Sequence, residues 1–512
     1  MRAFRDGVLR GVKKIFKPDP RSPLEKEATE LLARFPTNED GKFALVNACE
    51  AFLEEFRRCE RPTGELRFLA SRMLASLRRH DEAIAVLAAI PAGEVDAAKR
   101  AFYRAELSYL AGDIEAAERH FAGVDRLQLQ VRPSWKRSLD RFEKHKHALQ
   151  GKRRALDVYA ALARAEGPDL QPLQALLAGP GLDDAQRTYY QFIHDRVAHI
   201  ASLSQSDAVA PAALPDVRPV FACGFGWSGS GAVSAFLSQS TEVVLPFGHS
   251  EMAHLQGRNR VRGVKPFLKT RKLTADGMRM LLVEFACRSV GTFGESKDGY
   301  SLYPYYIDAA SRTALGAALD AFAREMFTTA ALNNRAARGT AVARFVLQAI
   351  AILSPGARPV LNNVFMAGNV ALARYMPAAT FVIVKRDLRD QYIARKLEGR
   401  AAYGRPVTEF AEMIQRAWGK YVRNAKAGDA WLPNIVEVQF EEFVREPACR
   451  GRLLDVLGID AGSIVVDKSK FDPEVSGKNA GIHESYARSD EIRMLDDLAT
   501  HFDYSKKGVV TL

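Results

Sequence analysis

Cysteine is scarce in this sequence, and its few cysteines form no motif. None of them belongs to a C-x-x-C pair, and the H-E-x-x-H motif of zinc enzymes is missing as well. An odd, scattered set argues against a disulfide framework and a structural zinc site, and it fits a reducing compartment such as the cytoplasm. We therefore expect no metal ion. The five positions are Cys49, Cys59, Cys223, Cys287 and Cys449.

The sequence also lacks a long apolar run. No window approaches the roughly 20 apolar residues of a membrane-spanning helix, and the N-terminus is no secretory signal because charges interrupt it throughout. In this basic tail, residues 1–18, Phe4, Val8, Val12 and Ile15 recur at helical spacing. Such a helix can lie on an anionic membrane surface, which would hold a cytoplasmic protein peripherally at the inner face of the cell membrane. Packing of the helix on the next domain is the open alternative.

Acidic residues are outnumbered by basic ones. The chain has 73 Lys and Arg against 61 Asp and Glu, a formal net charge of +12. This balance suits a nucleotide, an acidic glycan, a nucleic acid or an anionic membrane, without choosing among them; a solvated basic surface accounts for most of the charges equally well. The motifs below favour a nucleotide and a glycan, and we expect no nucleic acid.

Residues 19–203 have the pattern of a helical-repeat domain. Apolar residues return every three to four positions, and residues 73–83 resemble residues 107–117, with a period of 33 when Ala83 is aligned with Ala116. Helix pairs of about 34 residues are the tetratricopeptide signature, so this domain resembles a tetratricopeptide region that could bind a protein partner. A plain helical bundle remains open. A linker rich in Ser, Ala and Pro follows at 204–217.

Strand and helix patterns alternate over the remaining residues, 218–512. This alternation predicts an α/β fold with a parallel sheet and helices on both faces, preceded by the all-α domain. Ligands bind such sheets outside the carboxyl ends of the strands. Three polar clusters lie at strand ends: residues 224–231, 362–363 and 385–390.

The first cluster is a glycine-serine loop between a strand and a helix, an arrangement that suits a phosphate because many N–H groups can converge on one anion. Gly224, Gly226 and Gly229 match the G-x-G-x-x-G dinucleotide fingerprint, but no acidic residue ends the next strand. A nucleoside-triphosphate loop would need Lys and Ser or Thr where Ser230 and Gly231 stand. The loop therefore predicts a phosphate site of another type.

The cluster at residues 385–390 suggests the ligand. Arg386 and Arg389 follow the apolar strand 380–384 at the start of a helix, where their guanidinium groups can fork onto a second phosphate. A glycine loop at one strand end and arginines at another fit a ligand with two separate phosphates. One such ligand is 3′-phosphoadenosine-5′-phosphosulfate (PAPS).

At this point the sequence resembles the PAPS-dependent sulfotransferase family, with its P-loop-like fold. Four segments carry the resemblance: 226–231 (GWSGSG), 382–390 (VIVKRDLRD), 436–447 (VEVQFEEFVREP) and 471–481 (FDPEVSGKNAG). They are similar to the 5′-phosphosulfate loop, the 3′-phosphate segment, the strand and acidic helix that follow, and the loop that covers the cofactor. The resemblance implies cofactor-binding roles for Gly226, Trp227, Ser228, Gly229, Ser230, Gly231, Ala232, Arg386, Arg389, Lys478 and Asn479.

Two positions depart from the family pattern. Trp227 stands where the family loop usually has a lysine that stabilises charge on the leaving phosphate, and Ala394 stands where it has a 3′-phosphate serine. Another cation must take over from the lysine, and Arg389 or Arg395 could replace the serine. The candidates for the missing cation are Lys385, Lys478 and Lys297.

The acceptor side is expected after the first loop. By resemblance to glycan sulfotransferases, Glu251 is the expected general base, with His254 and His249 as alternatives. Asn362 and Asn363, at a strand end, could orient the acceptor or the cofactor. The resulting hypothesis is sulfuryl transfer from PAPS to a hydroxyl of a glycan or glycolipid in a bacterial cytoplasm. A dinucleotide-dependent oxidoreductase and a non-catalytic PAPS-binding adaptor are the alternatives.

Overall fold

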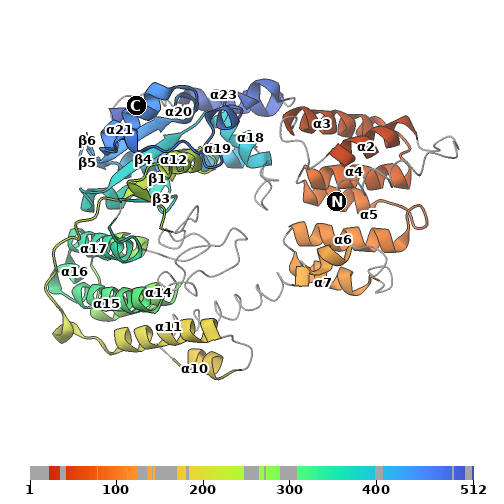
Figure 1. Ribbon diagram of the computed structural model, residues 1–512. Helices are drawn as coiled ribbons and strands as arrows, with labels where there is room; N and C mark the ends of the chain where they lie inside the picture. Colours follow the sequence, from red (N-terminus) through yellow and green to blue (C-terminus); the bar gives the residue numbers. More distant parts are fainter. Residues whose placement is uncertain are drawn as a thin grey trace. The chain divides into compact units, whose positions relative to one another are not determined.

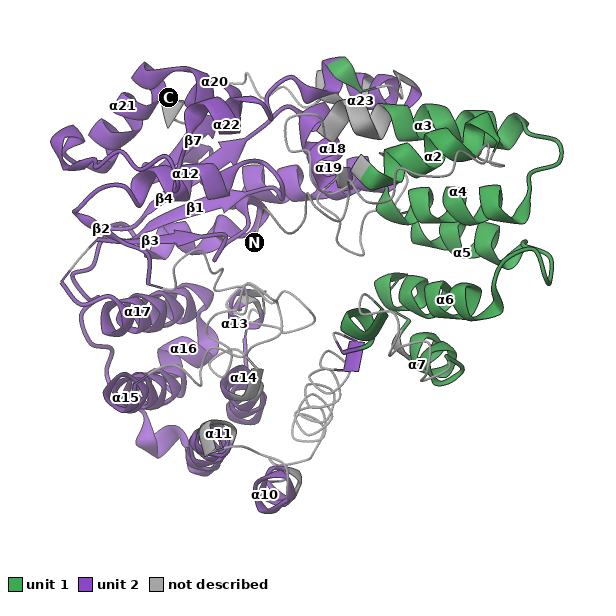
Figure 2. Cartoon of the chain, turned by 45° about the vertical axis from the view of Figure 1, so that its right-hand side comes forward, with its two compact units in different colours: residues 1–139, 399–404, 485–487 green, residues 140–398, 405–484, 488–512 purple. Residues whose placement is uncertain are grey.

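The computed structural model of the chain is shown in Figure 1, and its contacts divide it into two compact units (Figure 2). The first unit takes residues 1–139, 399–404 and 485–487, and the second takes residues 140–398, 405–484 and 488–512. The residues that the structure describes are 22–34, 42–77, 79–111, 113–124, 135–140, 142–143, 170–179, 184–246, 264–269, 272–288, 308–356, 358–397, 407–486, 489–501 and 510–511. The basic tail, residues 1–18, lies outside them.

The first unit is helical where it is described, as predicted. Its consecutive helices pack on one another, and the pairs α4–α5 and α6–α7 begin 33 residues apart, at Gly64 and Ala97. Within the first pair, Ser71 Oγ donates to the buried Ala83 carbonyl at 2.8 Å. The helices are α2 (Pro23–Arg34), α3 (Lys42–Arg58), α4 (Gly64–Ser76), α5 (His80–Ala88), α6 (Ala97–Ala111) and α7 (Ile114–Ala122).

The second unit begins with more helices. Figure 1 shows α11, α15 and α17 stacked in succession, and Arg196 of α11 forms an ion pair with Asp320 of α15. This packing groups α10 and α11 with the second unit, so the contact-based division falls earlier in the chain than the predicted linker at 204–217. The helices are α10 (Gln171–Ala178), α11 (Asp184–Ser202), α13 (Lys265–Lys269), α14 (Ala275–Arg288), α15 (Ala309–Met326), α16 (Thr329–Asn333) and α17 (Arg335–Leu353).

Helix α17 corrects the expectation that no apolar window is long enough to span a membrane. By length and composition it could do so, and core helices of soluble proteins pass the same test. Here 61% of the window is buried inside the structure, and the helix packs against α13, α15 and α16. Its Arg338 is fully buried and donates to the main-chain carbonyls of Phe267, Ala331 and Leu332.

The sheet of the second unit is parallel, which confirms the predicted α/β class. Its strand order is β2-β3-β1-β4-β7-β8, and every neighbouring pair runs parallel. The strands are β1 (Val220–Gly224), β2 (Val243–Val244), β3 (Arg358–Asn362), β4 (Thr380–Lys385), β7 (Ile435–Gln439) and β8 (Val510–Thr511). A small antiparallel ribbon consists of β5 (Lys426–Ala427) and β6 (Ala430–Trp431).

Helices cover both faces of this sheet because side chains alternate along each strand. Val220, Val382 and Val436 face a core shared with α12 (Ser230–Leu237), α20 (Phe440–Arg445) and α21 (Pro447–Leu457). On the opposite face, Phe221 contacts Phe365, and the 3₁₀ segment η6 (Ala367–Tyr375) packs on α19 (Val407–Asn424). The remaining described elements near the site are α18 (Leu388–Leu397), α22 (Pro473–Gly477) and α23 (Ser489–His501).

Candidate active site

The strand order places the glycine loop at the point where the sheet topology reverses. Strand β1 lies between β3 and β4, with Ala222 paired to Asn362 and Gly224 to Val384. The carboxyl ends of the three strands therefore meet at one edge, the position where open α/β sheets bind ligands. All three polar clusters predicted from the sequence lie at this carboxyl edge.

The loop between β1 and α12 turns sharply through left-handed backbone. Gly226 has φ 88° and Gly229 has φ 92°, values that glycine adopts without strain. A Cβ on Gly229 would also lie 2.1 Å from the Phe440 ring. Trp227 has φ 54°, an uncommon conformation for a bulky side chain. Such local strain is a feature of ligand sites.

The amide groups of the loop form a cradle for an anion. Among the described residues, no acceptor bonds the N–H groups of Gly226, Ser228, Gly229, Ser230 and Gly231. Gly229 is the N-cap of α12, so the positive end of that helix dipole adds to the cradle. Amides without an acceptor at a helix start suit the binding of a phosphate.

Asn363 holds this loop in place, a role that the sequence did not reveal. Its Oδ1 accepts hydrogen bonds from Gly224 N–H and from Ser230 Oγ, both at 3.1 Å. Like Trp227 it has left-handed backbone, with φ 52°. The loop is further closed by Phe225 N–H, which donates to Ser228 Oγ at 3.1 Å.

Asn362 is arranged differently from its neighbour. Its Oδ1 is buried, and no hydrogen-bond partner for that atom occurs within the described part of the chain. Its Nδ2 lies 3.9 Å from the place where a Cβ on Gly231 would sit, so the side chain stands beside the start of α12. Asn362 is therefore better placed than Asn363 to bond a ligand, and the acceptor role predicted for both stays a prediction.

Arg386 joins the loop to the cofactor-covering segment. Its guanidinium group donates to the Trp227 carbonyl at 3.1 Å and to the Asn479 carbonyl, and it lies 5.0 Å from the Phe440 ring. Its exposed fraction is only 5%. A neighbour in the next helix, Gln391, donates to the Gly226 carbonyl and was missed at the sequence level. The predicted 3′-phosphate segment thus contacts the predicted 5′ loop directly.

Arg389 is held by carboxylates. Its guanidinium group lies 2.6 Å from Asp387 Oδ2 and 2.9 Å from Asp496 Oδ1. Burial raises the pKa of Asp387, but the hydrogen bonds and charge of Arg389 outweigh it and keep that pKa below its usual value. The cofactor-binding role predicted for Arg389 remains a prediction, because the structure gives its charge two protein partners.

The candidates for the missing loop lysine stand in different surroundings. Lys385 is buried, with its Nζ 2.6 Å from Glu437 Oε2, and Glu437 Oε1 accepts a hydrogen bond from Tyr421 at 2.6 Å. Burial and the Glu437 carboxylate raise the pKa of Tyr421, so its hydroxyl keeps its proton. Since Glu437 neutralises Lys385, that lysine is a poor substitute. Lys478 is the C-cap of α22, and Lys297 lies outside the described residues.

Asp390 fixes the covering segment that contains Lys478 and Asn479. Its buried carboxylate accepts hydrogen bonds from Gly481 N–H at 2.6 Å and His483 N–H at 3.0 Å, and His483 Nδ1 lies 2.6 Å away. This clamp sets the segment against the start of α18. It explains how Asn479, 93 residues distant in the chain, meets Arg386.

The acceptor half of the site is not described. Glu251, His254 and His249 belong to residues 247–263, which lie outside the described residues. Within the described ranges, no group of His, Cys, Asp and Glu could hold a metal ion. The described geometry therefore concerns the donor half of the site.

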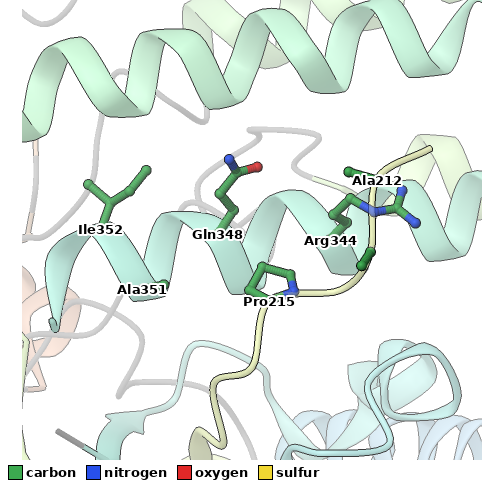
Figure 3. A pocket seen from close by; sticks show the side chains of 7 residues that line it. Ala212, Pro215, Arg344, Gln348, Ala351 and Ile352 are labelled. Atoms are coloured by element: carbon green, nitrogen blue, oxygen red, sulfur yellow. The ribbon is translucent and has the colours of Figure 1, made fainter. Parts of the chain in front are cut away.

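Two hollows lie at the opposite, amino edge of the sheet. One, of about 410 Å³, separates the linker from α17 and is lined by Ala212, Ala213, Pro215, Arg344, Gln348, Ala351 and Ile352 (Figure 3). The other, of about 570 Å³, lies where β1 and β3 begin and is lined by Asp216, Val217, Arg218, Glu242, Ala351, Ser354, Pro355, Gly356 and Arg358. Neither contains a residue of the glycine loop.

Comparison with known proteins finds sulfotransferases similar to this chain. A family model described as the sulfotransferase family matches residues 219–461. No curated protein matches the chain. Among solved structures, the crystal structure of sulfotransferase STF9 from Mycobacterium avium is similar, with 14% sequence identity, 68% of this chain and 95% of that chain covered, and a TM-score of 0.28. Residues 219–461 of this chain are therefore similar to the sulfotransferase family.

Proposed function

We propose that the chain is a PAPS-dependent sulfotransferase that acts on a hydroxyl group of a glycan or glycolipid. The observation that carries the proposal is the loop 226–231: the amides of Gly226, Ser228, Gly229, Ser230 and Gly231 have no acceptor among the described residues, and Arg386 donates to the Trp227 carbonyl. The loop amides suit one phosphate, and the neighbouring guanidinium group suits a second. PAPS carries phosphate groups at its 5′ and 3′ positions.

The reaction is an in-line displacement at sulfur. The acceptor oxygen forms a bond to sulfur while the bond between sulfur and the 5′-phosphate oxygen breaks, and its electron pair stays on that oxygen. The acceptor proton passes to a base. The products are a sulfate ester, 3′,5′-ADP and the proton, so the step needs no redox partner. Donors at the leaving phosphate and a base at the acceptor are the two requirements.

We assign the base to Glu251, with His254 as the alternative. Both follow β2, whose neighbour β3 ends at Asn362 beside the loop. A chain segment that leaves this part of the sheet can reach the carboxyl edge, where the acceptor hydroxyl must meet the donor. A carboxylate there would take the proton as the bond to sulfur forms.

The helical unit and the basic tail suit a cytoplasmic enzyme that binds a protein partner and a membrane surface. Stacked helix pairs offer a surface for a protein partner, and the net charge of +12 suits an acidic acceptor or an anionic membrane. We propose peripheral attachment at the inner face of a bacterial cell membrane, where glycolipid acceptors are made.

Calorimetry with 3′,5′-ADP tests the donor site. We expect saturable binding by the full chain and about tenfold weaker binding by Ser230→Ala, which removes a hydroxyl from the cradle. NADH fluorescence in the same samples should show no enhancement. Absence of 3′,5′-ADP binding at high micromolar concentration would overturn the proposal, and NADH binding would favour an oxidoreductase. Incubating extracts of the source organism with radiolabelled PAPS and the chain would then identify the acceptor.

A further inference from the structure

The glycine loop contains no cation, although a leaving phosphate needs one. Residues 224–231 include neither Lys nor Arg, and sulfuryl transfer leaves an extra negative charge on the 5′-phosphate. A fixed positive charge at that point is among the largest contributions that an enzyme can make to such a step. The cation must therefore reach the loop from another element.

Arg395 of α18 reaches the loop through the side chain of Trp227. Its guanidinium carbon lies 5.4 Å from the centre of the Trp227 ring and 5.5 Å from the Phe410 ring. One of its nitrogens, Nη1, lies 3.6 Å from Met413 Sδ. The exposed fraction of Arg395 is 6%. Aromatic faces attract a guanidinium group within about 6 Å, and more strongly where water is excluded.

Arg386 also contacts Trp227 but in another way. Its nitrogens bond main-chain carbonyls of the loop and of the covering segment, so it bridges those two segments. Arg395 instead lies against the indole of the loop residue, and stacking engages the face of a guanidinium group while its N–H bonds point outward in the plane. Arg386 thus contacts the backbone of Trp227, and Arg395 contacts its side chain.

We propose that Arg395, held by Trp227, is the cation that stabilises the leaving 5′-phosphate. The inference rests on the proposed function. It also accounts for a bulky tryptophan at positive φ in this loop: the indole holds a guanidinium group 5.4 Å from its ring. As the sulfur–oxygen bond to the phosphate breaks, the electron pair remains on the phosphate oxygen, and Arg395 offsets that charge. No proton moves to or from Arg395.

Two ligands distinguish a role of Arg395 at the 5′-phosphate from a role at the 3′-phosphate. 3′,5′-ADP carries both phosphates, whereas 5′-AMP carries only the one at the loop. We expect Arg395→Gln to weaken the binding of both ligands by the same factor, about tenfold for a charge acting within the protein. The dissociation constant of 5′-AMP divided by that of 3′,5′-ADP then stays constant. The matched control, Arg386→Gln, should weaken the binding of 3′,5′-ADP more than that of 5′-AMP, so this ratio should shrink. Calorimetry of both ligands on the unaltered chain and the two variants measures all six dissociation constants.

A rescue variant tests whether charge or structure is responsible. Adding Trp227→Lys to Arg395→Gln places a cation on the loop itself, and we expect it to recover most of the lost 5′-AMP affinity; Arg395→Lys should keep it within a few-fold. Thermal melting identifies any unfolded variant, in which case Arg395→Lys decides. An unchanged affinity for 5′-AMP in a folded Arg395→Gln, a shrunken ratio, or loss of affinity in a folded Arg395→Lys would overturn the inference. Failure of the unaltered chain to bind 3′,5′-ADP would instead overturn the proposed function and the inference with it.

Discussion

The two edges of the sheet differ in their hollows and in their hydrogen-bond donors. Two hollows lie at the amino edge, and two of the cations that line them have protein partners: Arg344 forms an ion pair with Glu325, and Arg358 donates to the carbonyls of Leu457 and Gly458. The carboxyl edge has the glycine loop, with donors that no described residue satisfies. Neither of the two hollows contains a residue of this loop, whose amides suit an anion.

This difference teaches that unsatisfied donors identify the site better than empty volume does. A buried N–H without a partner costs free energy in the folded chain, and Ser228 and Ser230, two of the five residues with such amides in the loop, are buried. A hollow lined by Asp216, Glu242, Arg218 and Arg358 has balanced charge and no such requirement. Each prediction below tests whether function belongs to the carboxyl edge alone.

Glu251→Gln has the largest expected effect. If Glu251 is the base, turnover should fall by about 10²–10⁴-fold, the usual contribution of a positioned general base, while 3′,5′-ADP binding stays the same because the donor half is intact. Transfer of radiolabel from PAPS to the acceptor and calorimetry measure the two quantities. Equal turnover in Glu251→Gln would remove this residue from the mechanism, and the same test on His254→Gln would follow.

Arg386→Ala should weaken 3′,5′-ADP binding by about 100-fold, since hydrogen bonds from a guanidinium group to phosphate are charge-assisted. Arg389→Ala is the matched control on the same segment. Its charge is already paired with Asp387 and Asp496, so we expect a change of less than about threefold. A larger loss for Arg389→Ala than for Arg386→Ala would reverse this assignment within the carboxyl edge.

These arginines show where sequence-based prediction succeeds and fails. The alternating apolar runs predicted the parallel sheet, and the strand expected at 380–384 is observed as β4, Thr380–Lys385. Local patterns of this kind depend on nearby residues. One partner of Arg389, Asp496, is 107 residues distant, and Asn363 bonds Gly224 across 139 residues. Such contacts depend on strand order and register, which a single sequence does not determine.

The same limit applies to the helices and the loop cation. The helical period of residues 19–203 predicted the helix observed as α11, but the packing of α11 onto α14 and α15 depends on a fold that the period does not encode. Arg395 was expected as a substitute at the 3′-phosphate, and only its distance from the Trp227 ring suggests the 5′ end. The role proposed for Arg395 therefore depends on its contact with Trp227, which the sequence alone does not reveal.

Acid should weaken the Asp387–Arg389 ion pair, with a smaller effect than those expected on turnover and 3′,5′-ADP affinity. The pKa of Asp387 is lowered in the folded chain from 3.8, so its contribution to stability is complete above that value and is lost as pH falls through the folded pKa. We expect Asp387→Asn to lower the free energy of unfolding by about 1 kcal/mol at pH 7. The difference from the unaltered chain should shrink near pH 3. Urea unfolding at both pH values measures it, and an equal difference at both would show that the charge is unimportant.

Arg344→Met, at the amino edge, should leave 3′,5′-ADP affinity unchanged. The side chain lines the hollow beneath the linker (Figure 3), and its removal leaves the buried Glu325 without its ion-pair partner. The variant should therefore lose about 1–3 kcal/mol of unfolding free energy, which shows that the substitution is felt by the fold. Calorimetry on the folded variant isolates binding from stability. If affinity fell in a variant that remains folded, donor binding would depend on both edges, and unsatisfied donors would no longer be sufficient to locate the site.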